Sequence, residues 1–179
     1  KELPLLIPDK IISFSLSTLV YTRDLYGPQR ALLYLLLTLA GAWMSDTGAY
    51  FVGCAIGKHK LSPEVSPKKT VEGAVGGLVV CTASFALFGY LYTLAMAHYG
   101  YTVQVHYGEL LLIAPILSLI SILGDLSASV LKRQHQVKDY GRIMPGHGGI
   151  MDRFDSVLFV APVLYVLVSF WPLMTMIPQ

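Results

Sequence analysis

The chain has 179 residues, of which 54% are hydrophobic and only 13% are charged. Soluble globular domains carry about a quarter charged residues, so this composition excludes an ordinary soluble domain and indicates a polytopic membrane protein. The net charge of +2 is too small to indicate a nucleic-acid-binding protein, and no basic stretch is interleaved with aromatic residues.

The first apolar segment, residues 3–20, is predicted to be at most a partial membrane span. Two prolines and the charges of Asp9 and Lys10 interrupt it, and the uncharged run that follows is shorter than the ~20 residues of a crossing helix. Because the chain begins without a methionine, we expect it to be the C-terminal part of a longer protein. Residues 1–179 are expected to form a single transmembrane catalytic domain.

Four stronger apolar segments follow along the chain. Asp46 is the only charged residue between Arg30 and Lys58, and none lies between Glu72 and Glu109. Uncharged stretches of this length are typical of helices that cross a bilayer. The predicted fold class is therefore all-α, a polytopic transmembrane helical bundle with spans over residues 31–57, 73–97, 109–131 and 156–177.

Two polar loops, residues 58–72 and 132–155, hold four and five Lys or Arg residues respectively. Two predicted spans separate these loops, so both loops face the same side of the membrane. The connection between the two spans contains neither Lys nor Arg, and the positive-inside bias therefore places the charged loops in the cytoplasm. We expect an integral, multi-pass protein of the inner or plasma membrane, with a polar active-site pocket at the cytoplasmic face.

Glycines recur at helix-packing spacing in two of the spans. Gly53 with Gly57, and Gly73 with Gly77, permit close approach of helix backbones in lipid. A second interpretation stays open, in which Gly73, Gly76 and Gly77 leave backbone amides free to bind a phosphate at the start of a helix.

Several chemistries are not indicated by the sequence. Cys54 and Cys81 both lie in apolar segments without metal-binding spacing, so we expect both to be buried small side chains. The chain has no HExxH, CxxC, GxSxG or Walker-type motif and no Rossmann fingerprint. Zinc hydrolysis, redox chemistry and P-loop chemistry are therefore not predicted.

Four aspartates near one predicted membrane face are the strongest chemical signal. Asp125 lies inside a span, where either a function or an internal ion pair with Lys132 explains it. Asp152 and Asp155 share one face at the head of the last span, although acids in a first helical turn also favour the helix dipole. Asp46 has either a structural or a functional role. Carboxylates gathered at one membrane face are ligands suited to Mg²⁺ and a substrate phosphate.

Positive side chains accompany these carboxylates in both polar loops. A positive-inside flank explains some of them, and Lys68 and Lys69 also fit a solvated loop. The glycine turn GHGG, which permits close approach to a bound group, is not explained by either alternative. Together, these residues predict a membrane enzyme that handles phosphates with Mg²⁺.

The stretch from Ser129 to Asp155, SVLKRQHQVKDYGRIMPGHGGIMDRFD, resembles the signature of the phosphatidate cytidylyltransferases, also called CDP-diacylglycerol synthases. One departure is Met144, where that family prefers Leu, Ile or Phe, and methionine conserves the volume. The resemblance extends upstream through SDTGAYFVG, GKHKLSPEVSPKKTVEGAVGG and LGDLSASVLKR, so it covers nearly everything from Trp43 to Ser156.

This resemblance implies a reaction of CTP with phosphatidic acid that gives CDP-diacylglycerol and pyrophosphate in phospholipid biosynthesis. It implies Mg²⁺, with K⁺ as a second cation, a homodimer in the membrane, and no nucleic acid. The catalytic residues implied are Asp125, Asp152, Lys132 and Asp155. The metal ligands implied are Asp125 and Asp152, extended by Asp155 and Asp46. The phosphate-binding residues implied are Arg133, Lys138, His147, Gly148, Gly149, Arg153, Lys68 and Lys69.

Two rival functions differ from this expectation. A related transferase or kinase would act on an isoprenoid lipid or a polyprenol in place of phosphatidate. A cation transporter or channel would use Asp46 and Asp125 to line an ion path, but it leaves the stretch GHGGIMDRFD unexplained.

Overall fold

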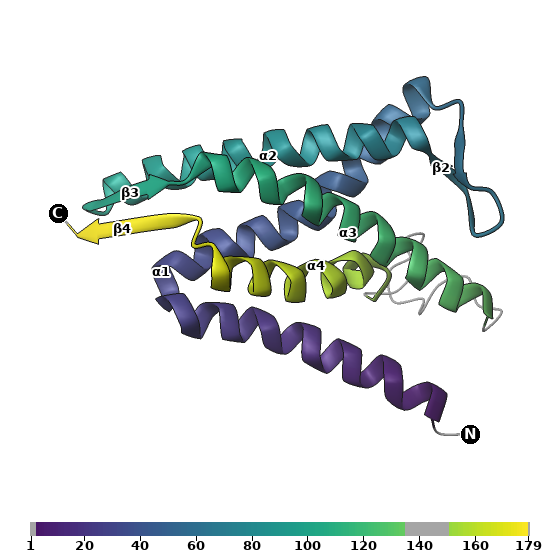
Figure 1. The fold of residues 1–179 in the computed structure, drawn as a ribbon, viewed down its shortest axis with the longest axis horizontal. Helices are drawn as coiled ribbons and strands as arrows, with labels where there is room; N and C mark the ends of the chain where they lie inside the picture. The colour runs from purple at the N-terminus through teal and green to yellow at the C-terminus, as the bar shows by residue number, and fades with distance from the viewer. Residues whose placement is uncertain (1–2, 135–150, 179) are drawn as a thin grey trace.

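The computed structural model describes residues 3–134 and 151–178 and is mostly helical (Figure 1). The helices are α1 (Leu3–Ile56), α2 (Val71–His98), α3 (Tyr107–Gln134) and α4 (Met151–Phe170). Four short strands are β1 (Lys60–Ser62), β2 (Ser66–Thr70), β3 (Tyr101–Val105) and β4 (Met174–Pro178).

Helix α1 is two helical segments joined at Gly27. The backbone there has φ 74° and ψ 166°, a conformation that glycine adopts without steric cost. The chain turns back at this point, so residues 3–26 and 28–56 form the two arms of a V (Figure 1). The hydroxyl of Tyr26 donates to the carbonyl of Val168, which ties this turn to the end of α4. The segment 3–20, predicted to be at most a partial span, thus lies within a longer helical arm.

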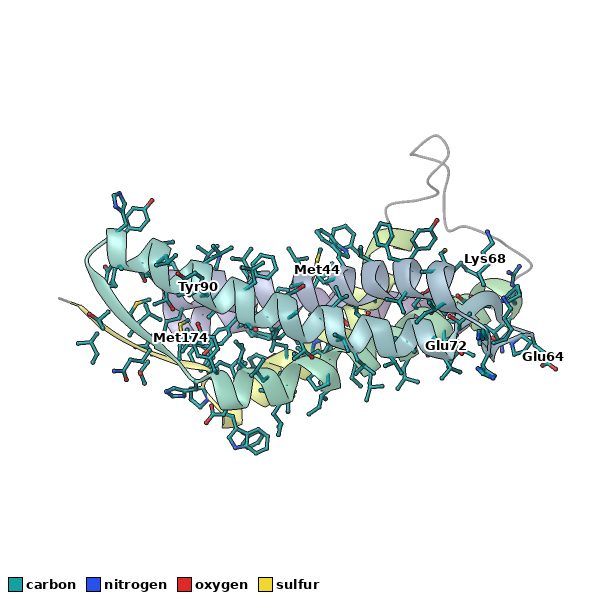
Figure 2. All side chains as sticks on the ribbon, turned by 90° about the horizontal axis from the view of Figure 1, so that it is seen from above. Met44, Glu64, Lys68, Glu72, Tyr90 and Met174 are labelled. Carbon is teal, nitrogen blue, oxygen red and sulfur yellow. The ribbon has the colours of Figure 1, made fainter. Side chains whose placement is uncertain are left out.

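The helical arms run alternately between two ends of the molecule (Figure 1). One end holds the β1–β2 hairpin, the end of α3 and the start of α4, and the other end holds Gly27 with β3 and β4. Glu64, Lys68 and Glu72 lie together at the hairpin end (Figure 2). The first polar loop therefore lies at the same end as the start of the second one, as the charge pattern predicts.

The short strands depart from the all-α prediction. Strand β4 pairs antiparallel with β3, from Met174 opposite Val105 to Pro178 opposite Tyr101. Helix α4 ends at Phe170, before the predicted end of the last span at residue 177, because Pro172 removes an amide donor that a helix would need. The apolar sequence of β4 resembles the continuation of a helix, and only its distant partner strand makes it extended.

The core lies between the second arm of α1 and the other three helices. Its largest fully buried side chains include Tyr34, Leu37, Phe85, Leu117 and Leu164. Many large apolar side chains of α2 and α3 are instead exposed on the outer surface. Among the described helices, α2 and α3 are long and apolar enough to cross a membrane, and their exposed apolar side chains suit a lipid environment.

Close packing of α1 against α2 depends on small residues. A Cβ atom on Gly73 would lie 2.6 Å from the carbonyl oxygen of Ala49 and 3.2 Å from the Cα atom of Gly53. The amide of Gly73 donates to Thr70 Oγ1 over 3.1 Å, which caps the start of α2. The packing interpretation of these glycines is therefore confirmed, and the amide of Gly73 is already used within the protein.

We expect Gly73→Ala to lower the free energy of unfolding by about 1–3 kcal/mol, because the new methyl group would force the two helix backbones apart. Thermal unfolding in detergent measures this change. Gly108→Ala is the matched control, since a Cβ at Gly108 meets nothing within 4 Å and alanine favours the helix. Equal midpoints for the two variants would contradict the role of close backbone packing.

Candidate functional site

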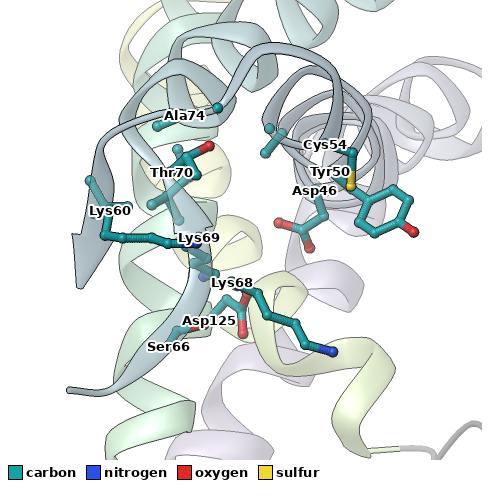
Figure 3. A pocket seen from close by; sticks show the side chains of 15 residues that line it. Asp46, Tyr50, Cys54, Lys60, Ser66, Lys68, Lys69, Thr70, Ala74 and Asp125 are labelled. Atoms are coloured by element: carbon teal, nitrogen blue, oxygen red, sulfur yellow. Dashed lines mark ion pairs between the residues drawn. The ribbon is translucent and has the colours of Figure 1, made fainter. Parts of the chain in front are cut away.

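A cavity of about 610 Å³ opens at the hairpin end of the molecule, between α1, the hairpin, α2 and α3 (Figure 3). Its polar lining combines acids, bases and hydroxyl groups from elements far apart in the sequence. The lining side chains that carry charge or a hydroxyl are Asp46, Tyr50, Lys60, Ser66, Lys68, Lys69, Thr70 and Asp125. The apolar part of the wall includes Ala49, Ala74 and Ile122.

Asp125 pairs with Lys69 across this cavity. The Nζ atom of Lys69 lies 2.5 Å from Asp125 Oδ2, and the side chains are 24% and 28% exposed. Such partial burial weakens the screening by water, so the pair is held more firmly than an exposed surface pair. The sequence left open an ion pair between Asp125 and Lys132, and this is not the pairing in the fold.

Lys132 pairs instead with Asp155 at the start of α4. The Nζ atom of Lys132 lies 3.6 Å from Asp155 Oδ2, and both side chains are nearly buried, at 13% and 10% exposure. Asp155 Oδ1 also accepts a hydrogen bond of 2.8 Å from the amide of Ser156. This carboxylate, predicted from the sequence to belong to the site, thus faces the last turns of α3.

Asp46 is held by hydroxyl groups from two other helices. Ser156 Oγ of α4 donates to Asp46 Oδ2 over 3.0 Å, and Ser121 Oγ of α3 donates to Asp46 Oδ1 over 3.4 Å. Asp46 and Asp125 line the same cavity, and Ser156 contacts both Asp46 and Asp155. The fold therefore gathers three of the four aspartates that the sequence singles out.

The hairpin that carries Lys69 is closed by Glu72, which sequence reasoning missed. Glu72 Oε2 accepts hydrogen bonds from the amides of Lys58 (3.1 Å) and His59 (3.2 Å). The Nδ1 atom of His59 lies 2.6 Å from Glu72 Oε1, and the Val71 amide donates to the His59 carbonyl. An acid in the first turn of a helix that follows a basic loop was the available signal, but the fold supplies its partners.

A second, smaller hollow of about 250 Å³ lies beside the cavity. It is lined by Val65, Ser66, Pro67, Lys68, Ser129, Lys132 and Arg133. Three predicted phosphate-binding or catalytic cations, Lys68, Lys132 and Arg133, therefore come together from β2 and α3. Ser66 and Lys68 also line the larger cavity, so the two spaces share a wall.

Other predicted site residues cannot be placed in this arrangement. Lys138, His147, Gly148 and Gly149 lie outside the described residues. Asp152 and Arg153 belong to the first turn of α4, but their side chains lie outside the description. Within the described residues, no group of three Asp, Glu, His or Cys side chains is arranged to hold a metal ion by itself.

The two cysteines differ in their surroundings. Cys81 is fully buried, as expected, and its Sγ atom lies 3.5 Å from the carbonyl oxygen of Ala114. Cys54 is exposed and lines the larger cavity, so the expectation that it is buried is wrong. The apolar residues around Cys54 in the sequence gave no sign of this exposure. Cys54 lies only two residues before the end of α1 at Ile56, where the cavity opens beside the helix.

Comparison with known proteins places this chain in a family. A model of the cytidylyltransferase family matches residues 11–171. The chain is 47% identical over 146 residues to the phosphatidate cytidylyltransferase of Bacillus subtilis (strain 168), covering 82% of this chain and 49% of that protein. It is 47% identical over 134 residues to the phosphatidate cytidylyltransferase of Staphylococcus saprophyticus, covering 75% and 48%. The resemblance inferred from the signature is confirmed, and the chain spans about half the length of the curated relatives it matches.

We expect Glu72→Ala to loosen the hairpin, because the amides of Lys58 and His59 would lose their charged acceptor. Hydrogen–deuterium exchange should become severalfold faster for the amides of β1 and β2, with little change in α3 and α4. Glu64→Ala is the matched control, since Glu64 is an exposed acid at the tip of the same hairpin. Unchanged exchange in Glu72→Ala would show that the strand pairing alone holds the hairpin.

Proposed function

Since the chain belongs to the cytidylyltransferase family, we propose that it transfers the cytidylyl group of CTP to phosphatidic acid, giving CDP-diacylglycerol and pyrophosphate. One observation carries the proposal. A carboxylate-lined cavity and a cation-lined hollow lie side by side at one end of an apolar helical bundle. Such a site lets a polyphosphate and a lipid phosphate meet at a membrane boundary.

The cations are suited to bind substrate phosphates. Lys68, Lys132 and Arg133 line the hollow, and arginine binds phosphate oxygens in a bidentate manner. Holding both substrates in line reduces the entropic cost of the reaction, and fixed positive charge stabilises the charge that develops on the transferred group. We propose that Lys138, His147, Gly148, Gly149 and Arg153 complete the phosphate-binding set.

The bond-making step is a displacement at the α-phosphorus of CTP. An oxygen of the phosphatidate phosphate attacks this phosphorus in line, and the bond to the pyrophosphate oxygen breaks. The attacking phosphate monoester has a second pKa of ~6, so it is already mostly ionised near neutral pH. The protein therefore needs no separate general base, and its task is to position and neutralise the phosphates.

The carboxylates fit a role with Mg²⁺. Mg²⁺ usually takes one or two protein carboxylates, and it completes its coordination with water and substrate phosphate oxygens. Asp125 and Asp46 line the same cavity, so the donor set matches this mode, although no three-residue cluster forms within the part of the chain that the structure describes. We propose that Asp125 and Asp152 hold the ion, that Asp155 and Asp46 extend the site, and that K⁺ is a second cation. Bound there, Mg²⁺ would neutralise phosphate charge.

The fold also supports a membrane location for the reaction. The exposed apolar side chains of α2 and α3 suit the bilayer, and the charged hairpin lies at one end of these helices. We propose a multi-pass protein whose site faces the cytoplasm, following the positive-inside bias. The homodimer implied by the family resemblance belongs to the same proposal.

Asp125→Asn tests the proposed reaction. We expect formation of CDP-diacylglycerol and pyrophosphate from CTP and phosphatidic acid in mixed micelles to fall by roughly 100-fold or more. Asp24→Asn is the matched control, because Asp24 is an exposed acid that pairs with Arg23 outside the cavity, and its loss should change the rate little.

The outcome separates the proposed reaction from its rivals. Turnover of a polyprenol in place of phosphatidate would favour the related transferase or kinase. Cation flux into liposomes without CTP would favour a channel. Full turnover in Asp125→Asn would exclude this carboxylate from the site. The same assay on Asp152→Asn tests Asp152, whose side chain is not among those that the structure describes.

A further inference from the structure

Two buried serines contact the carboxylate in the cavity wall. Ser121 of α3 is 0% exposed and Ser156 of α4 is 1% exposed, and both direct their hydroxyl groups to Asp46 of α1. Asp46 itself lines the cavity. The contact thus joins three helices at the point where the candidate site begins.

We propose that Ser156, assisted by Ser121, is a positioning residue that fixes the Asp46 carboxylate and sets its place relative to Asp155. The inference rests on the proposed function, because it assigns these serines to the cation-binding wall of that site. Neither serine needs to touch a substrate. Each acts through the carboxylate that it holds.

Ser156 is the stronger tie of the two. Its hydroxyl donates to Asp46 Oδ2 over 3.0 Å, while its amide donates to Asp155 Oδ1 over 2.8 Å. One residue thus bridges two carboxylates that would otherwise repel each other. The hydroxyl of Ser121 has a single proton and lies 3.4 Å from both Asp46 Oδ1 and the carbonyl oxygen of Ala42, so each of its contacts is weaker.

The geometry leaves Asp46 able to bind a cation. A carboxylate oxygen has about two lone pairs, and each oxygen of Asp46 accepts one serine hydrogen bond. The hydrogen bonds therefore orient the group without consuming its capacity as a ligand. Partners of this kind behind a ligating group commonly change metal affinity or activity by about 10–100-fold when they are removed.

Ser118 supplies a matched control on the same helix. It is 0% exposed, like Ser121, and it precedes Ser121 by less than one helical turn. Its hydroxyl lies 2.6 Å from the hydroxyl of Ser45 and, among the described residues, forms no hydrogen bond with a carboxylate. Ser118→Ala therefore removes an equally buried hydroxyl while leaving the Asp46 contacts in place.

The experiment measures cation binding apart from turnover. Mn²⁺, a paramagnetic probe for a Mg²⁺ site, is titrated into the purified chain without substrates, and free Mn²⁺ is counted by electron paramagnetic resonance. We expect Ser156→Ala to weaken Mn²⁺ binding by roughly tenfold and Ser121→Ala by a smaller factor of about three. Ser118→Ala should bind Mn²⁺ as the unchanged chain does, and Ser156→Thr, which restores the hydroxyl, should recover much of the loss.

A parallel readout is the Mg²⁺ concentration that gives half-maximal turnover. We expect it to rise in Ser156→Ala, with the KM for CTP little changed at saturating Mg²⁺. Thermal unfolding of each variant shows whether the fold is intact.

Three results would overturn the proposal. These are an equal loss of Mn²⁺ binding in Ser118→Ala, unchanged Mn²⁺ binding in a folded Ser156→Ala, and no Mn²⁺ binding by the unchanged chain. Failure of the proposed reaction would look different, because Mn²⁺ binding would still depend on Ser156 while no CDP-diacylglycerol formed.

Discussion

The ion pair between Lys69 and Asp125 is the contact on which the arrangement of the site depends. Lys69 comes from a short strand, whereas Asp125 comes from a helix of largely apolar sequence. An unpaired carboxylate in a helix of this kind would cost free energy, and so would an unpaired, partly buried lysine on the hairpin. Their pairing compensates both charges and connects the hairpin to α3 across the cavity.

The same constraint governs Asp155 and Asp46, the other two site aspartates whose side chains the structure describes. Asp155 is compensated by Lys132 and by the amide of Ser156, and Asp46 by two serine hydroxyls. Removing one partner of a buried ion pair leaves the other charge uncompensated, which usually costs more free energy than the pair itself contributes. Each of these carboxylates therefore depends on its partner staying in place. Under the proposed function, a substrate phosphate at Lys69 or Lys132 competes with an internal carboxylate, and a bound cation gives that carboxylate a replacement partner.

Local sequence patterns predicted the long helices, but they did not predict features that depend on contacts between distant segments. Charge-free stretches predicted α2 and α3 well, because a helix that faces lipid needs apolar residues around much of its surface. The strand character of β4 was not predicted, since it arises from pairing with β3 far away in the sequence. The turn at Gly27 was also missed, because a single glycine within an apolar segment does not reveal its φ angle.

The candidate site was predictable in its residue types and less so in its pairings. Helical spacing left open an ion pair between Lys132 and Asp125, yet Asp125 pairs with Lys69 of the hairpin and Lys132 with Asp155 of α4. Sequence spacing describes neighbours on one helix, whereas partners across helices depend on packing. Cys54 illustrates the same limit, because its apolar neighbours indicated burial but a cavity opens beside it.

A strand beside the helices explains how two adjacent lysines can contact different groups. Successive side chains of a strand point to opposite faces, whereas adjacent residues of a helix diverge by only about 100°. On β2, Lys69 pairs with Asp125 in the cavity, while the exposed Lys68 lines both the cavity and the hollow that Arg133 also lines. The short hairpin thus supplies positive charge to both spaces, and Glu72 ties the hairpin to the start of α2. Under the proposed function, both lysines of β2 are placed to contact a substrate with several phosphates.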